Sequence, residues 1–124
     1  MTQLQEVLTR FKAINSVDLA VVASSDGMEI ASYKRPHPTN GVDVEHICAI
    51  ATTGLRISEA LGQETERGES RQTILEYESG AILLEPLSGD AMILVVSADP
   101  NSIGRIRYLS KKYHQELLDG LNAV

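Results

Sequence analysis

The chain has 124 residues, 43% hydrophobic and 23% charged, which is ordinary for a globular protein, so we expect one domain over residues 1–124. Its formal net charge of −6, its 4% aromatic content and its lack of tryptophan argue against nucleic-acid binding, which needs clustered cations or stacking platforms. The first residues lack a signal peptide's apolar segment, no run is long enough to span a membrane, and the single cysteine suits a reducing compartment. We therefore expect a cytoplasmic protein with no membrane partner.

Apolar residues repeat at spacings of three and four from Leu4 to Ile14, which predicts an amphipathic helix over residues 2–14 with Thr2 as its N-cap. The runs DLAVVA and MEIASY then flank the short sequence SSDG. An Asp-Gly pair between two such runs predicts a β-hairpin. Residues 34–43, with two prolines and a glycine, predict a loop, and Asp43 is placed to cap the helix that follows.

Residues 44–61 predict a long helix with two neighbouring apolar stripes. The first stripe consists of Ile47, Ile50, Gly54, Ile57 and Leu61. The second stripe consists of Val44, Cys48, Ala51 and Leu55. Together they cover about half of the helix, whereas a helix on one face of a sheet needs a stripe of roughly 100°. We expect the first stripe to face the sheet and a dimer partner to cover the second; the alternative is that the terminal helices or the loop cover it within one chain.

Residues 71–100 predict three strands joined by turns at Ser79-Gly80 and Gly89-Asp90. The run QTILEYE alternates and carries charge, which is typical of an edge strand, whereas the apolar run AMILVVSA predicts a central strand covered on both faces. A last helix follows DPNS, with Asn101 or Ser102 as its cap. The expected fold class is α/β (α+β), in the order α-β-β-α-β-β-β-α. Its five-stranded antiparallel sheet has the long helix on one face and the terminal helices on the other.

The sequence offers little catalytic chemistry. The histidines His37, His46 and His114 are scattered, with no second ligand at the spacing of a metal site. Cys48 lies on an apolar stripe, which is typical of a small buried hydrophobic residue rather than a nucleophile. Neither GxxxxGK[ST] nor GxGxxG occurs, so no phosphate-binding loop is predicted. We therefore expect no enzyme activity, no cofactor and no metal.

Three segments in order resemble the Roadblock family of dynein light-chain-like proteins: VDLAVVASSDGMEIASY, the apolar middle helix, and ILLEPLSGDAMILVVSADPNSIGRIRYLSKK. The hairpin SSDGMEIAS and the helix opening NSIGRIRYLSKK are the most similar parts, and the resemblance runs from Leu4 to about Leu121. It implies a profilin-like sandwich and a homodimer whose sheets join edge to edge and whose middle helices pack together. The dimer interface that it implies comprises Val44, Cys48, Ala51, Leu55, Thr73, Ile74, Leu75 and Tyr77.

The same resemblance implies a role beside Ras-like small GTPases, as regulator, GTPase-activating partner or scaffold, with bacterial gliding-motility proteins among the nearer relatives. The polar surface of the paired middle helices would then face the GTPase through Glu45, Thr52, Arg56 and Glu59. The alternative function is a small-molecule sensor, since related sandwiches hold ligands between sheet and helix. The core-facing residues are aliphatic and offer no polar groups to orient a ligand, which favours the binding platform.

Overall fold

The computed structural model describes residues 1–36 and 43–124. Two short 3-10 helices, η1 (Arg10–Ala13) and η2 (Pro100–Ser102), accompany the main elements. The main elements are α1 (Gln3–Thr9), β1 (Val17–Ser24), β2 (Glu29–Lys34), α2 (Val44–Glu64), β3 (Thr73–Tyr77), β4 (Gly80–Ser88), β5 (Ala91–Ser97) and α3 (Ile103–Asn122). This order confirms the predicted one. Most of the predicted loop, including His37, lies outside the described residues.

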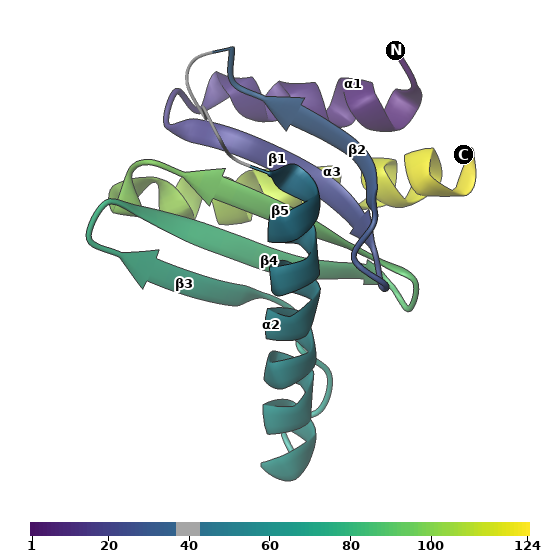
Figure 1. Cartoon of the computed structure of the whole chain (residues 1–124), viewed down its shortest axis with the longest axis vertical. Helices are drawn as coiled ribbons and strands as arrows, with labels where there is room; N and C mark the ends of the chain where they lie inside the picture. Colours follow the sequence, from purple (N-terminus) through teal and green to yellow (C-terminus); the bar gives the residue numbers. More distant parts are fainter. Residues whose placement is uncertain (37–42) are drawn as a thin grey trace.

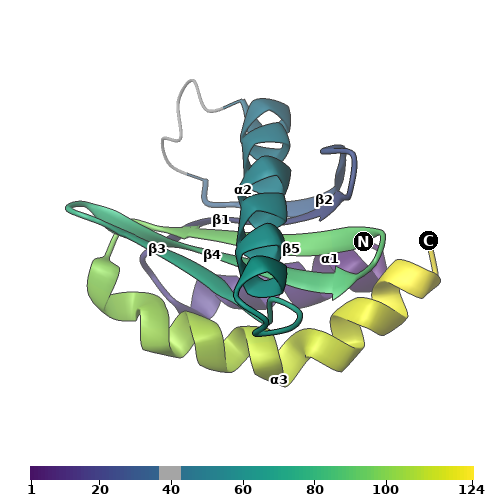
Figure 2. The ribbon, with the colours of Figure 1, turned by 90° about the horizontal axis from the view of Figure 1, so that it is seen from below.

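The five strands form one antiparallel sheet in the order β2-β1-β5-β4-β3. The apolar strand β5 is central and β3 lies at an edge, as the sequence predicts. Figures 1 and 2 show that α2 covers one face of the sheet and that α1 and α3 cover the other. Side chains alternate between the two faces along each strand, so Ile93 and Val95 point to the α1–α3 side while Met92 and Leu94 point to α2.

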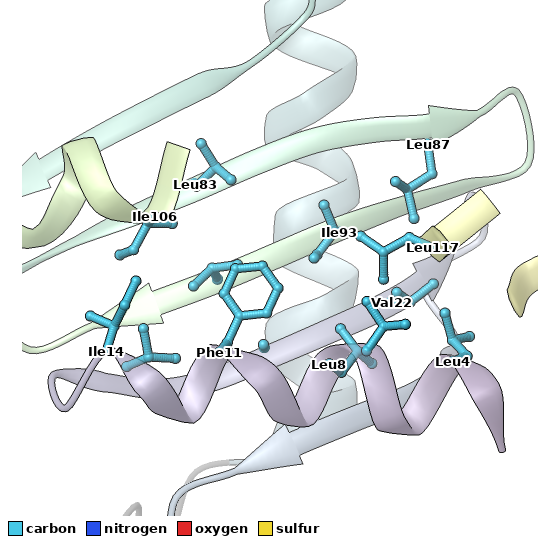
Figure 3. Packing of buried hydrophobic residues seen from close by; sticks show 14 of the residues in the cluster. Leu4, Leu8, Phe11, Ile14, Val22, Leu83, Leu87, Ile93, Ile106 and Leu117 are labelled. Carbon is cyan, nitrogen blue, oxygen red and sulfur yellow. The ribbon is translucent and has the colours of Figure 1, made fainter. Parts of the chain in front are cut away.

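The larger core lies between the sheet and the terminal helices. The hydroxyl of Thr2 caps α1 as predicted, because its Oγ1 accepts a hydrogen bond from the N–H of Gln5 at 3.1 Å. Phe11 on η1 is fully buried and meets the ring of Tyr113 edge-on, with the ring centroids 5.9 Å apart. Figure 3 shows how the first helix and α3 meet over the sheet through Leu4, Leu8, Phe11, Ile14, Ile106 and Leu117.

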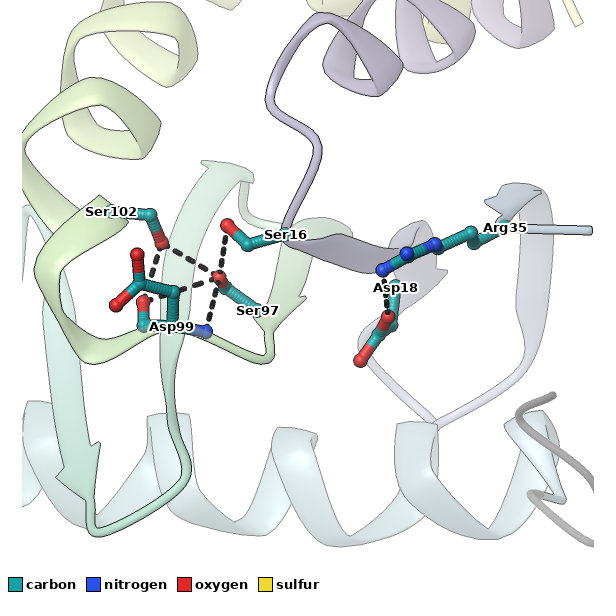
Figure 4. Close-up of polar contacts among 6 residues, drawn as sticks. All are labelled: Ser16, Asp18, Arg35, Ser97, Asp99 and Ser102. Atoms are coloured by element: carbon teal, nitrogen blue, oxygen red, sulfur yellow. Dashed lines mark hydrogen bonds and ion pairs between the residues drawn. The ribbon is translucent and has the colours of Figure 1, made fainter. Parts of the chain in front are cut away.

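Ser102, one of the two predicted candidates, is the N-cap residue of α3, but its side chain makes no capping hydrogen bond. The side-chain cap belongs to the preceding η2, where the carboxylate of Asp99 accepts a hydrogen bond from the N–H of Asn101 at 2.9 Å. A proline follows Asp99 and suits the first position of this helical turn. The hydroxyl of Ser102 instead lies 2.6 Å from the Oγ of Ser97, which donates to the Oγ of Ser16 at 2.8 Å (Figure 4). This cluster fastens α3 to the chain that enters β1.

Helix α2 connects opposite edges of the sheet, because β2 and β3 are its two outer strands. Asp43 caps α2 as predicted, accepting hydrogen bonds from the N–H groups of Glu45 and His46. A five-stranded sheet is about 19 Å wide between its outer strands, whereas 21 helical residues span about 31 Å. The last turns of α2 therefore project beyond β3 (Figure 1). There α2 contacts the returning chain, with the Oγ atoms of Ser58 and Ser70 2.9 Å apart.

Gly80 begins β4 at a point where two segments of backbone come very close. A Cβ added at Gly80 would clash with the carbonyl oxygen of Ser97. We expect Gly80→Ala to lower the free energy of unfolding by about 1–3 kcal/mol, because β4 must move away from the end of β5. Gly89→Ala in the next turn is the control, since nothing lies within 4 Å of its added Cβ. Urea denaturation checks the difference, and equal stability of the two variants would contradict it.

Candidate interaction surface

The structure reverses the predicted orientation of α2. The second stripe faces the sheet of its own chain: Cys48 is fully buried, and Leu55 is only 9% exposed. Its four residues pack into a core with Leu19, Val21, Ala23, Leu84, Met92 and Leu94. The predicted place of Val44, Cys48, Ala51 and Leu55 in a dimer interface is therefore wrong. The small side chains of Cys48 and Ala51 allow the helix to lie close to the sheet, which explains why this stripe points inward.

Three residues of the first stripe, predicted to face the sheet, are exposed instead, whereas Ile47 packs against the core under α2 as predicted. Ile50, Ile57 and Leu61 are 60%, 58% and 62% exposed. Together with Gly54 they follow one another at intervals of four, three and four residues, which places them on one flank of the helix. Ile57 and Leu61 also belong to the last turns, which project beyond the sheet. Several large apolar side chains exposed side by side are typical of a surface that contacts another protein.

The edge strand β3 continues this apolar surface. Leu75 and Tyr77 lie opposite Ile82 and Gly80 in the register with β4. Residues directly opposite each other project from the same face of a sheet, and Ile82 packs towards α2. Leu75 and Tyr77 therefore lie on the α2 side, where they are 39% and 55% exposed.

We call this combined surface the α2–β3 surface; it consists of Ile50, Ile57, Leu61, Leu75 and Tyr77. It holds five of the nine exposed large hydrophobic residues in the described part of the chain. The two other predicted interface residues of β3 make contacts within their own chain. Thr73 donates a hydrogen bond to the Oγ of Ser58 on α2 at 2.8 Å, and Ile74 packs into the core on the opposite face.

The predicted partner-binding residues divide into two groups. Glu45, Arg56 and Glu59 are exposed on the other flank of α2, away from the α2–β3 surface. Thr52 is only 4% exposed, and its hydroxyl donates to the carbonyl of Ala49 at 2.9 Å. Its predicted role in partner binding is therefore wrong. Thr52 lies beside the second stripe on the helix. It is buried because that stripe faces the sheet, and the sequence does not show which stripe does so.

Arg56 and Glu59 line an open groove of about 1220 Å³. The groove lies between the second half of α2, the turn that joins β4 to β5, and α3. Its walls carry charges of both signs, including Arg71, Lys111 and Glu69. Such a wide, polar groove suits contact with a protein surface better than enclosure of a small apolar ligand.

One buried carboxylate at the groove was missed by sequence reasoning. Glu85 is only 4% exposed; it accepts hydrogen bonds from the Nε2 of Gln72 at 2.8 Å and from the Oγ of Ser110 at 3.0 Å. The Nδ1 of His114 lies 3.2 Å from the same carboxylate, and the Nε of Arg107 donates to the Oε1 of Gln72 at 3.1 Å. This network fastens the segment that enters β3 to α3. The only sequence signal was a lone charge within the apolar run ILLEPL.

The thiol of Cys48, which lies in the described part of the chain, is not activated as a nucleophile. Burial, helped by the charges of Glu29 and Glu45, raises the pKa of the Cys48 thiol to about 11, so the thiol stays protonated at neutral pH. Within residues 1–36 and 43–124, no group of three or more histidine, cysteine or acidic side chains is placed to hold a metal ion. In the same part of the chain, no helix combines the length and the apolar character needed to cross a bilayer. Aliphatic side chains fill the space between α2 and the sheet, where a sensor would hold its ligand.

Known proteins share this arrangement. The family model of the Roadblock/LC7 domain matches residues 3–98. MglB of Myxococcus xanthus superposes with a TM-score of 0.86 at 15% identity, over 100% of this chain and 98% of that one. The gliding protein MglB of Thermus thermophilus superposes with a TM-score of 0.85 at 11% sequence identity, over 98% of this chain and 90% of that one. Profilin II of Acanthamoeba castellanii superposes with a TM-score of 0.61 at 12% sequence identity, over 95% of this chain and 96% of that one. The fold is therefore profilin-like. No curated protein sequence matches the chain.

Proposed function

The chain belongs to the Roadblock/LC7 domain family, and from this membership we propose that it is a non-catalytic homodimeric platform that binds a Ras-like small GTPase. The observation that carries the proposal is the α2–β3 surface, where five large hydrophobic side chains are exposed together. A surface of this kind beside an open strand edge is unfavourable in water. A second copy of the chain would cover both features at once.

The position of β3 at the edge of the sheet supports the proposed dimer. Two β3 strands that pair antiparallel across a two-fold axis would join the sheets into one and place both α2 helices on the same side. The exposed flank of each α2 would then pack against the flank of the other. Thr73, Leu75 and Tyr77 would lie in this interface. On α2, the interface residues would be Ile50, Ile57 and Leu61 instead of the predicted residues of the second stripe.

The paired α2 helices would form the docking face for the GTPase. Glu45, Arg56 and Glu59 are exposed on the flank that the dimer leaves free, and the last two line the open groove. The Nε of Arg56 donates to the carbonyl of Thr52 on its own helix, at a long 3.4 Å. We assign Arg56 a role in docking rather than that of an arginine finger, because it lies along its own helix. Any effect on GTP hydrolysis would then come from positioning the GTPase's own residues.

We expect the charge reversals Arg56→Glu and Glu59→Lys together to weaken GTPase binding about fivefold to tenfold at low salt, mainly through the association rate, and less at high salt. Isothermal titration calorimetry measures this effect with a Ras-like GTPase of the same organism, loaded with GDP or with a non-hydrolysable GTP analogue. Two chains should bind one GTPase, because a single partner placed over a two-fold axis cannot meet both halves identically.

The matched control is Arg105→Glu with Glu6→Lys, which exchanges the same charges on the opposite side of the sheet. It should leave GTPase binding unchanged. Unchanged binding by the Arg56 and Glu59 variant would move the docking face away from α2. A stoichiometry of one chain per GTPase would contradict the docking of a single GTPase across the two-fold axis.

A further inference from the structure

The terminal helices carry an excess of positive charge in an acidic protein. Six of the eleven lysine and arginine residues lie on α1, η1 and α3, with three of the seventeen acidic residues. The rest of the chain is therefore more acidic than its net charge of −6 indicates. We call this layer the α1–α3 face; its cations are Arg10, Lys12, Arg105, Arg107, Lys111 and Lys112.

The acids of α3 are engaged, which leaves its cations in excess. Glu116 pairs with Arg10 at 2.7 Å, and Asp119 accepts a hydrogen bond from Gln115 at 3.0 Å. Among the described residues, no salt bridge involves any of the four cations in the first half of α3. The acids therefore do not neutralise this half of the helix.

An exposed aromatic ring lies within the cationic stretch. Arg105, Tyr108 and Lys112 follow at intervals of three and four residues, so they share one outer flank of α3. Tyr108 is 64% exposed, and the Nζ of Lys112 lies 6.0 Å from the centre of its ring. Tyr108 and Arg105 also border a shallow hollow of about 360 Å³. Tyrosine is enriched where protein surfaces meet the headgroups of a bilayer, and here it lies beside lysine and arginine.

The orientation of this face relative to α2 matters for its function. It lies on the opposite side of the sheet from α2 (Figure 2). In the proposed dimer, on which this step rests, edge-to-edge joining of the sheets places both α1–α3 faces on one side and the GTPase-binding helices on the other. The dimer would therefore present the exposed Arg105, Tyr108 and Lys112 of both copies on the same side.

We propose that the α1–α3 face binds an anionic phospholipid surface, so that the dimer holds its GTPase partner at a membrane. Each lysine or arginine near an anionic bilayer strengthens partition about fivefold. The acidic residues on the α2 side repel the bilayer only weakly, because they lie farther from it than the Debye length, which is about 8 Å at physiological salt. A broad helical layer fits a lipid surface better than an extended acidic peptide, which would need a groove between the cations. The sequence expectation of no membrane partner rested on the absence of a spanning segment, which surface binding does not require.

Sedimentation with lipid vesicles tests the proposal on the full chain. The native protein should partition onto vesicles of phosphatidylcholine and phosphatidylglycerol, should not bind phosphatidylcholine alone, and should be released by salt. We expect Arg105→Glu with Lys112→Glu to weaken partition by at least about tenfold, and Arg67→Glu with Arg71→Glu to change it less than about threefold. The second pair makes the same change of charge on exposed residues of the segment after α2.

Three results would overturn the proposal: partition retained by the Arg105 and Lys112 variant, an equal loss in the control pair, or binding of soluble polyglutamate without binding of vesicles. The last result would assign the face to an acidic protein. Light scattering on the same samples separates this proposal from the dimer. A monomeric native chain that still binds anionic vesicles through Arg105 and Lys112 supports the membrane face and contradicts only the dimer.

Discussion

Replacing Ile57 or Leu61 by glutamate is expected to convert the proposed dimer into monomers while leaving the fold intact. Both side chains are more than half exposed in the single chain, so a charge there costs the monomer little. In the dimer the same carboxylate would be buried without a partner, and the two-fold axis would bring in its symmetry copy. Removal of one charge from water without compensation costs several kcal/mol. Light scattering at micromolar concentration measures the change in mass.

Two further variants show whether the effect belongs to the exposed flank. Gln63→Glu adds the same charge two residues from Leu61 but on the opposite flank, and it should leave the dimer intact. Leu55→Glu should instead destabilise the monomer, because Leu55 is buried against the sheet. A native chain that is monomeric at micromolar concentration would refute the proposed use of the α2–β3 surface. Dissociation caused by Gln63→Glu would move the interface to the other flank.

Phe11→Ala is expected to lower the free energy of unfolding by about 3–5 kcal/mol. Phe11 is fully buried and joins η1 to α3 through its contact with Tyr113. Its removal leaves a cavity that the surrounding strands and helices fill only in part. Since the net stability of a domain is typically about 5–15 kcal/mol, this loss is a large fraction of the total. Urea denaturation followed by circular dichroism measures it.

The neighbouring Lys12 provides the control, because it lies on the same 3-10 helix and is exposed. Lys12→Ala should change the free energy of unfolding by no more than about 0.5 kcal/mol. A loss below about 1 kcal/mol in Phe11→Ala would mean that the layer of terminal helices contributes little to the core.

Local chemistry in the sequence was sufficient to predict the elements and most of their limits. Thr2 and Asp43 cap their helices because a side-chain oxygen can satisfy N–H groups a few residues away, whatever the rest of the chain does. The Asp-Gly hairpin, the central strand β5 and the edge strand β3 follow in the same way from turn chemistry and from the apolar pattern. The exposure of Glu45, Arg56 and Glu59 was also predicted from the pattern along the helix.

The tertiary structure alone decided which way α2 faces. Both of its stripes are apolar, and periodicity gives the width of an apolar face without its direction. The direction depends on packing: Cys48 and Ala51 fit close to the sheet, while the helix outruns the sheet and leaves Ile57 and Leu61 beyond it. Net charge likewise sums over the whole chain, and only the fold brings the cations of the two terminal helices, six of the eleven, into one layer. The sequence by itself thus determined what each segment forms, because that depends on near neighbours, and the fold determined which surfaces remain exposed, because that depends on residues far apart in the chain.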